Sequence, residues 1–511
     1  MSKQKNTDTN DKKVKKAKTP KIQKDVKNTK DPKNRAKHKK IRLILAIAYG
    51  LLFIAGAYAL LSVYVFDDKK NNDETSLAAK QSEEGELIEV NDDTESVIPI
   101  SKEELQARKE AEEQAKAGQA EGEEGEEAAE ETEIEKKAGQ LLSQMNFNEK
   151  IYQMMILTPE QLTGTDDVTA AGAKTKESLE QFPVGGIIYS SANLKDPSQT
   201  KMMLQNMEDF GQKTVGVPLF LCVNEEGGKA VSIGSNSAFK EKSVPAMGAI
   251  KSSEEAYNAG HTIGEYLWEL GFNVNLAPDC NVLTNAGNSA IGDRSFGSDP
   301  NIVREYAASY LGGLHDSRIL STFKCFPGYG ATADDPESGP SSTDRTLDEL
   351  REAELVPFMY AASAGADFVM VGHMSVPSVT GDNTPSSLSH EMVTGLLEDE
   401  LSYNGLIITD ALNSAAITGS YEPAQAAVMA IKAGNDMLLT PDDHASIPDK
   451  IKEAIDSGEI DEEQIDESVK KILVKKLVMT EEKEKRIKQE KEEKEKKEKE
   501  EKEKKNKKKK N

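Results

Sequence analysis

The run Leu406-Ile-Ile-Thr-Asp410 decides the fold, because it is one of eight short apolar segments that recur along the chain. The other seven are Ile151–Leu157, Val184–Ser190, Leu219–Asn224, Phe272–Pro278, Ser321–Phe326, Phe368–His373 and Met437–Thr440. Segments long enough for a helix separate them, such as Ser198–Thr214, Ser253–Leu270, Asp299–Asp316, Leu347–Ala364 and Pro423–Ala433. Short strands that alternate with helices predict parallel βαβ units. Eight such units predict an α/β fold, a single (β/α)8 barrel of the TIM type. A doubly wound dinucleotide-binding sheet is disfavoured, because no glycine-rich fingerprint follows the first strand.

Composition divides the 511 residues into five parts. These are a basic segment (1–42), an apolar run (43–66), an acidic linker (67–135), a globular region (136–480) and a Lys/Glu-rich tail (481–511). Only the globular region has enough large apolar side chains to bury a core, and its length suits one large barrel. The acidic linker is predicted to be disordered. For the tail two predictions stay open, a solvated single helix supported by i,i+4 pairs and a disordered polar chain.

The apolar run Leu43–Phe66 is predicted to be a transmembrane helix. It has no charged residue over 24 positions, and such a helix spans a hydrocarbon core of about 30 Å. Basic residues precede it and two aspartates follow, which places the N-terminus in the cytoplasm and the barrel outside. A cleaved signal peptide is the alternative, but its candidate site, Ala57-Tyr58-Ala59, lies inside the apolar run. Because the basic segment directly precedes a membrane segment, nucleic-acid binding is not expected.

Polar side chains collect where the predicted strands end, which is where the active sites of such barrels lie. They are Asn224, Glu225, Glu226, Asp279, Lys324, His373, Asp410 and Asp442. Carboxylates and amides suit a neutral ligand with many hydroxyl groups. The three cysteines form neither a disulfide framework nor a zinc-ligand spacing, so no metal or cofactor is expected.

Nine motifs occur in an order that resembles the barrel domain of glycoside hydrolase family 3. They are VGGIIYSSANLKDPSQ, VNEEGGK, NLAPDCNV, IGDRSFGSDP, KCFPGYG, DRTLDELREAELVPF, GADFVMVGHMSVP, TGDNTPSSLS and GLIITDALNSAAI. The resemblance covers roughly Lys136 to Met479 and is strongest to the β-N-acetylhexosaminidase branch. It implies a retaining β-glycosidase that acts on carbohydrate, such as peptidoglycan fragments or other cell-wall-type glycans outside the membrane, without a cofactor.

The resemblance also implies roles for individual residues. Asp410 in ITDAL resembles the catalytic nucleophile of the family, although an aspartate at a strand end can instead cap the next helix. Arg294 and Lys324 resemble substrate-binding residues, and His373 matches a histidine at a strand end in the family. Each of these three has an alternative as a structural ion pair or a core histidine. Asn224 stands where the family has a sugar-binding aspartate, and an amide forms weaker hydrogen bonds to hydroxyls than a carboxylate does.

The chain departs from the family at two further places. The family motif Lys-His-Phe-Pro-Gly-His-Gly here has Cys325 and Tyr329 in place of its histidines. The following loop, which carries an acid/base histidine in the hexosaminidase branch, here reads Asp335-Pro336-Glu337. Glu337 is therefore the candidate general acid/base, with a pKa raised by burial or by Asp335. The alternative is a catalytically impaired protein that binds glycans or acts as a membrane-tethered scaffold. Retention of the nucleophile and of both substrate-binding cations favours the enzyme.

Overall fold

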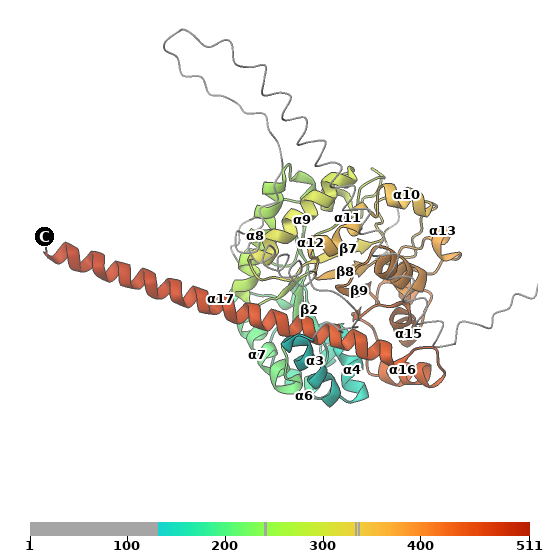
Figure 1. The fold of residues 1–511 in the computed structure, drawn as a ribbon, viewed down its shortest axis with the longest axis horizontal. Coiled ribbons are helices and arrows are strands. Elements are labelled where there is room, and N and C mark those ends of the chain that lie inside the picture. Colours follow the sequence, from blue (N-terminus) through green and yellow to red (C-terminus); the bar gives the residue numbers. More distant parts are fainter. Residues whose placement is uncertain (1–130, 240–242, 333–334, 336–337, 511) are drawn as a thin grey trace, which may run out of the picture. The chain divides into compact units, whose positions relative to one another are not determined.

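All eight predicted strands are present, and they form one parallel sheet (Figure 1). The computed structural model describes residues 131–239, 243–332, 335 and 338–510. The strands are β1 (Met155–Leu157), β2 (Gly186–Tyr189), β3 (Phe220–Val223), β6 (Val274–Asn275), β7 (Thr322–Phe326), β8 (Phe368–Val371), β9 (Leu406–Ala411) and β10 (Met437–Leu439). Their order in the sheet is β6-β3-β2-β1-β10-β9-β8-β7. Most of their side chains are buried on both faces, as is typical of parallel strands covered by helices.

The two edge strands of this sheet, β6 and β7, approach each other and nearly close it into a barrel. Isolated parallel bridges join Val274 to Leu320 and Asp279 to Lys324. The Asn275 N–H also donates to the Leu320 carbonyl at 2.9 Å. The arrangement is that of a TIM-type barrel, as predicted, and it brings the ends of β6 and β7 together at one edge of the site.

The sequence signals for helix ends explain the principal outer helices. Asp196, Ser252 and Asp299 accept backbone N–H groups in the first turns of three helices, and Gly216 and Gly271 end two of them in the left-handed conformation. The helices of the barrel and its flanks are α3 (Glu133–Gln144), α4 (Phe147–Gln153), α5 (Pro159–Thr163), α6 (Ala173–Gln181), α7 (Pro197–Val215), α8 (Ser253–Leu270), α9 (Pro300–Asp316), α10 (Leu347–Glu352), α11 (Val356–Met359), α12 (Ala361–Ala364), α13 (Pro377–Thr380), α14 (Ala415–Thr418), α15 (Pro423–Ala433), α16 (Ile447–Asp456) and α17 (Glu462–Lys510). A small hairpin of β4 (Glu225–Gly227) and β5 (Ala230–Val231) follows β3.

Two predicted elements have different boundaries in the structure. The first three residues of the predicted strand Ile151–Leu157 belong to helix α4, which starts earlier because Asn146 and Glu149 form a capping box. The predicted helix Leu347–Ala364 is divided into α10, α11 and α12. Pro357 lies inside this segment and lacks the N–H that a continuous helix requires.

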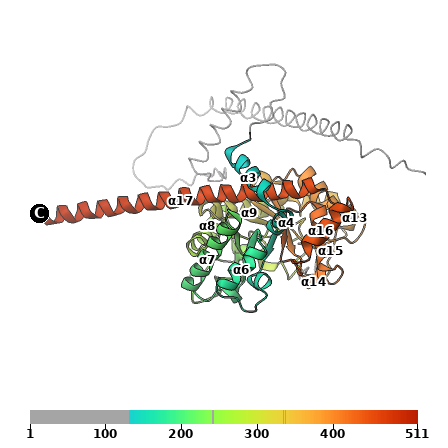
Figure 2. The ribbon, with the colours of Figure 1, turned by 90° about the horizontal axis from the view of Figure 1, so that it is seen from below.

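Helix α17 continues without a break across the boundary predicted at residue 481. Of the two predictions for the tail, the single helix is therefore the one that the structure shows, through Lys510. The helix lies against α3 and α4 (Figure 2). Its polar side chains bind residues that precede the strands: Ser468 donates to Asp436 at 2.9 Å, and Lys475 pairs with Asp367 at 3.0 Å. The first half of α17 therefore covers the end of the barrel where the strands begin, opposite the polar strand ends.

The anchor predicted at 43–66 lies outside the described residues, as does the acidic linker up to residue 130. Helix α3 begins at Glu133, just before the predicted start of the globular region. In the part of the chain that the structure describes, no helix is both long and apolar enough to span a bilayer.

One lysine of α17 is fully buried beneath the barrel. The Lys476 ammonium group donates to Gln153 Oε1 at 2.8 Å and lies 5.1 Å from the centroid of the Phe220 ring. Burial lowers the pKa of Lys476 to about 7, because an ammonium ion loses its hydration there. The folded protein therefore releases this proton at a much lower pH than the unfolded chain does.

We expect this difference to make the stability of the protein rise with pH. Between about pH 7 and pH 10 the unfolded chain holds a proton at Lys476 that the folded protein has released, so unfolding becomes less favourable by up to about 1.4 kcal/mol per pH unit. Lys476→Met should remove the contribution of Lys476 to the rise of stability with pH. Lys174→Met, at an exposed helix position, is the control and should leave the rise unchanged. Urea unfolding at pH 7, 8 and 9 measures the slope. Parallel pH profiles for the wild type and Lys476→Met would contradict the prediction.

Candidate active site

Asp410 lies near the end of β9, at the edge of the barrel where the strands end. Its Oδ1 accepts the Ala411 N–H at 2.9 Å, and its Oδ2 lies 3.7 Å from the Cys325 thiol, which donates to it. The next helix, α14, begins after Ser414. The helix-cap alternative for Asp410 is therefore disfavoured, and the carboxylate is held at the strand end.

His373 supports the same strand from β8. Its Nε2 lies 2.9 Å from the Ala411 carbonyl oxygen, and its Nδ1 lies 2.8 Å from the Ser387 hydroxyl. Burial lowers the pKa of His373, and the charge of Asp410 offsets part of this effect. A neutral imidazole satisfies both contacts, donating through Nε2 and accepting through Nδ1. His373 thus holds the backbone next to Asp410, and its predicted contact with substrate stays a prediction.

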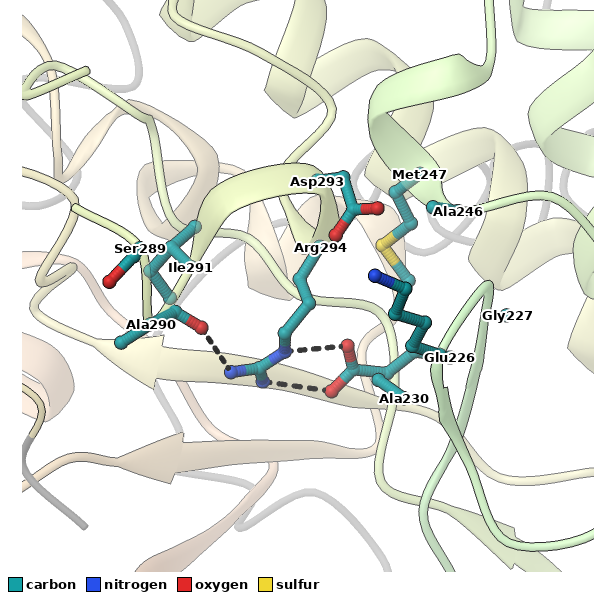
Figure 3. Close-up of a pocket in the computed structure, with 11 residues that line it drawn as sticks. Glu226, Gly227, Ala230, Ala246, Met247, Ser289, Ala290, Ile291, Asp293 and Arg294 are labelled. Carbon is teal, nitrogen blue, oxygen red and sulfur yellow. Dashed lines mark hydrogen bonds and ion pairs between the residues drawn. The ribbon is translucent and has the colours of Figure 1, made fainter. Parts of the chain in front are cut away.

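The other predicted binding residues meet around one buried carboxylate, Glu226. The Nε and Nη2 groups of Arg294 each donate to a Glu226 oxygen at 2.9 Å (Figure 3). Nη2 also lies 3.1 Å from Asp279 Oδ2. From β7, the Lys324 ammonium lies 2.6 Å from Glu226 and donates to Asn224 Oδ1 at 2.7 Å. Residues that are far apart in the sequence therefore form one continuous polar network.

The charges of this network balance. Burial by itself raises the pKa of Glu226, but the Lys324 and Arg294 charges outweigh it and hold the pKa below its usual value. Burial raises the pKa of Asp279, an effect that Arg294 opposes and the Glu226 charge increases. Two carboxylates and two cations have no net formal charge when all four are ionised, which suits an uncharged ligand. Among the described residues, no cluster of three or more His, Cys, Asp or Glu side chains could hold a metal ion.

The sequence placed Glu226 and Asp279 at strand ends but assigned neither a role. The signal that could have identified Glu226 is the glycine pair after it. Gly227 and Gly228 have φ values of 106° and 60°, a region that L-residues with side chains rarely adopt. A Cβ on Gly227 would also lie 2.6 Å from the Pro245 carbonyl oxygen. The tight turn that presents Glu226 therefore requires glycine.

The neighbouring carboxylate, Glu225, has a structural role. It accepts backbone N–H groups from Ser232, Ile233 and Gly234 at 2.7 to 2.8 Å, and the Tyr266 hydroxyl at 2.8 Å. These bonds fix the hairpin after β3. Of these two adjacent glutamates, Glu225 therefore holds the loop in place, and Glu226 binds the two cations of the site.

Of the two positions where the family motif has histidines, Cys325 contacts Asp410 and Tyr329 contacts Cys325. Cys325 is 3.7 Å from the carboxylate and 4.0 Å from the Tyr329 hydroxyl, and both side chains are buried. Burial raises the pKa of the Cys325 thiol and of the Tyr329 phenol well above their usual values. Both groups are therefore protonated near neutral pH and can serve as donors but not as bases.

The sequence of this barrel matches a known family model. The model of the glycosyl hydrolase family 3 N terminal domain matches residues 134–474, which is most of the described structure. The chain belongs to glycosyl hydrolase family 3. The motif order predicted this family, and the match confirms it.

Relatives within family 3 include named hexosaminidases. The chain is 26% identical over 329 residues to beta-hexosaminidase A of Pseudoalteromonas piscicida, covering 60% of this chain and 55% of that protein. It is 31% identical over 267 residues to beta-hexosaminidase LpqI of Mycobacterium tuberculosis, covering 51% of this chain and 68% of that protein. The solved structure of a family 3 beta-N-acetylglucosaminidase from Paenibacillus sp. str. FPU-7 matches with a TM-score of 0.61 and 31% identity, covering 66% of this chain and 63% of that one. The chain thus spans only about half of the first of these relatives.

The loop after β7 carries the predicted acid/base of this family 3 protein. Glu337 lies outside the described residues. Asp335 is partly buried, and its Oδ2 accepts the Ser338 hydroxyl at 3.2 Å. Proton transfer by Glu337 and its tuning by Asp335 stay predictions.

We expect the cysteines of this family 3 barrel to be unreactive in the native state. All three, Cys222, Cys280 and Cys325, are free and buried, and burial raises the pKa of each thiol. A thiol-reactive chromogenic disulfide at pH 7.5 should therefore detect almost no thiol in the folded protein and three per chain in denaturant. Rapid labelling of Cys325 in the native protein, identified by peptide mass, would show that the thiol beside Asp410 is accessible.

Proposed function

We propose that this protein is a retaining β-glycosidase of the β-N-acetylhexosaminidase type, which removes terminal sugars from cell-wall-type glycans. The observation that carries the proposal is the placement of Asp410 at a strand end, beside the network of Asn224, Lys324, Arg294 and Glu226, in a family 3 barrel. The hexosaminidase names of its relatives support the choice of sugar.

Asp410 is the nucleophile in this proposal. One carboxylate oxygen attacks the anomeric carbon as the bond to the leaving group breaks, which forms a covalent sugar ester. Water then attacks the same carbon and releases Asp410, so the configuration at that carbon is retained. The Ala411 N–H and the Cys325 thiol hold the carboxylate in place, which lowers the cost of orienting it for attack.

Arg294, Lys324 and Asn224 bind the sugar hydroxyls. Lys324 uses two of its three donors on Glu226 and Asn224, which leaves one donor for substrate. Asn224 accepts the Lys324 bond through Oδ1, and its NH₂ group can donate to a hydroxyl. Because Glu226 fixes both cations, their free donors are oriented before the substrate arrives.

Release of 4-nitrophenol from a panel of aryl β-glycosides tests the function, using the fragment from residue 131 onward and the full chain. We expect turnover of the N-acetyl-β-glucosaminide in preference to the β-glucoside. If a folded and monodisperse sample turns over no glycoside, the proposal fails. The chain would then be assigned as a glycan-binding protein, and glycan-binding assays would follow.

Glu337 is the proposed proton donor, an assignment that comes from the sequence. We expect Glu337→Gln to lower kcat/KM by about 10² to 10⁴-fold for a substrate with a poor leaving group, the usual contribution of general acid catalysis. For an activated leaving group such as 2,4-dinitrophenol the loss should be much smaller, since that group needs little protonation to depart. Asp344→Asn, at an exposed position of the same loop, is the matched control and should leave both values nearly unchanged. Equal losses for both leaving groups would exclude a general-acid role for Glu337.

We also propose, from the sequence alone, that residues 43–66 anchor the protein in the membrane with the barrel on the outer side. Fractionation of producing cells tests the anchor, and protease treatment of intact spheroplasts tests the orientation. Recovery of the full-length chain in the soluble fraction would contradict the anchor.

A further inference from the structure

A groove lies between α17 and the helices α7 and α8, at the end of the barrel where the strands begin (Figure 1, Figure 2). It consists of a cavity of about 560 Å³ and a smaller one of about 100 Å³. The two cavities share four lining residues: Glu208, Trp268, Gly271 and Lys483. Gly271 lies just before strand β6, whereas Asp410 lies near the end of β9. The groove is therefore at the opposite end of the strands from the active site.

Two apolar side chains in the wall of the larger cavity are singular in the sequence. Trp268 is the only tryptophan of the chain, and Ile487 is the only apolar residue after Thr480. The Ile487 side chain is 50% exposed, and Trp268 is half-buried. The single apolar residue of an otherwise polar helix end thus lies in the same cavity wall as the single indole.

Arg486 fixes the indole ring in place. Its guanidinium carbon lies 4.4 Å from the centroid of the Trp268 ring, and its Nη2 and Nε groups donate to Glu265 at 2.9 Å and to Glu490 at 2.8 Å. The indole N–H also donates to Glu490, at 3.2 Å. Arg486 lines the larger cavity but not the smaller one, so the ring offers the smaller cavity a surface that Arg486 does not cover. A ring held in this way needs little ordering when a ligand binds.

The rest of the lining indicates the chemical class of the ligand. Four carboxylates and three cations line the larger cavity, and most of them pair with each other: Glu208 with Lys483, and Glu265 and Glu490 with Arg486. Such a balanced lining does not attract a strongly charged ligand. Exposed polar groups at the rim can donate and accept hydrogen bonds: Lys201, Gln205 and Glu269.

A sugar unit has both properties that this lining requires. The C–H groups on one face of its ring pack on a flat aromatic surface, and the hydroxyls around its edge bind carboxylate, amide and ammonium groups. The larger cavity also lies within the range of about 300–1,000 Å³ that is usual for pockets that hold small ligands.

We propose that this groove is a second binding site for a neutral oligosaccharide, with a sugar ring packed against Trp268 and Ile487. The inference goes beyond the proposed function, because the groove takes no part in bond cleavage. A glycan polymer held there keeps other segments of the same polymer near the barrel, which raises their effective concentration.

Tryptophan fluorescence tests the site directly, because Trp268 is the only indole of the chain. The full chain with Asp410→Asn, in a detergent without a sugar headgroup, is titrated with N,N′,N″-triacetylchitotriose. We expect a saturable change in the emission of Trp268. In the same background, Ile487→Glu should weaken this binding about tenfold, since it places a charge where the sugar ring packs. Val478→Glu is the matched control, because Val478 is an exposed apolar residue of the same helix that lines neither cavity.

The outcomes separate failure of this site from failure of the glycosidase. Absence of an emission change, or the same dissociation constant in the Ile487→Glu and Val478→Glu variants, overturns the second site. A response to a tetralysine peptide in place of the oligosaccharide would assign the groove to a basic peptide and also overturn it. Turnover of aryl glycosides by the chain with Asp410 intact is measured independently, so either proposal can fail alone.

Discussion

Replacing Asp410 by asparagine should lower kcat by about 10⁴-fold or more, in line with the loss of a covalent nucleophile in other enzymes. The amide is nearly the same shape as the carboxylate, but it carries no negative charge and cannot form the sugar ester. The contact with the Ala411 N–H can persist through the amide oxygen, so the fold should be little affected. Steady-state release of 4-nitrophenol measures the loss, and thermal unfolding checks the fold.

The control for this experiment is Asp442→Asn. Asp442 also follows a strand, β10, but it is exposed and accepts only a weak bond of 3.3 Å from Gln161. Its replacement should leave kcat nearly unchanged. A covalent sugar adduct on a peptide other than that of Asp410, trapped with a slow substrate, would assign the nucleophile elsewhere.

Replacing Glu226 by glutamine should lower the free energy of unfolding by about 3–5 kcal/mol, the usual result of removing one partner from a buried ion pair. Glu226 is 1% exposed and accepts bonds from both Arg294 and Lys324. Without its charge these two cations repel each other, with only Asp279 left to balance Arg294. Binding of substrate should weaken as well, because the two donors lose their common anchor.

Urea unfolding measures this loss of stability. A double mutant tests whether the loss comes from the cations that are left without their partner. Lys324→Met combined with Glu226→Gln should cost less than the sum of the two single changes, since the uncompensated cation is gone. Glu459→Gln is the control: Glu459 pairs with Lys432 on the surface, and such pairs contribute about 0–1 kcal/mol. A loss below 1 kcal/mol for Glu226→Gln would show that the network does not depend on this charge.

Local features of the sequence determined the architecture. Each strand of the barrel is buried on both faces and therefore reads as a short apolar run, as Phe220–Val223 and Phe368–Val371 do. Capping residues marked the starts of several helices, and glycines marked their ends. Because active residues of such barrels follow the strands, the same pattern also placed Asp410, Lys324 and His373 at one end of the molecule. The family motifs then predicted their roles.

Only the tertiary structure decided which of these polar residues act together. Glu226 joins Arg294 across 68 positions of the chain, and Lys324 joins Asn224 across 100, distances over which no local pattern carries information. The same reason applies to α17: Lys476 lies within the predicted globular region, but no local pattern distinguishes it as the lysine that is buried beneath the barrel. Periodicity and caps are local properties that one segment reveals by itself. Ion pairing and burial depend on the neighbours that the closed barrel brings together.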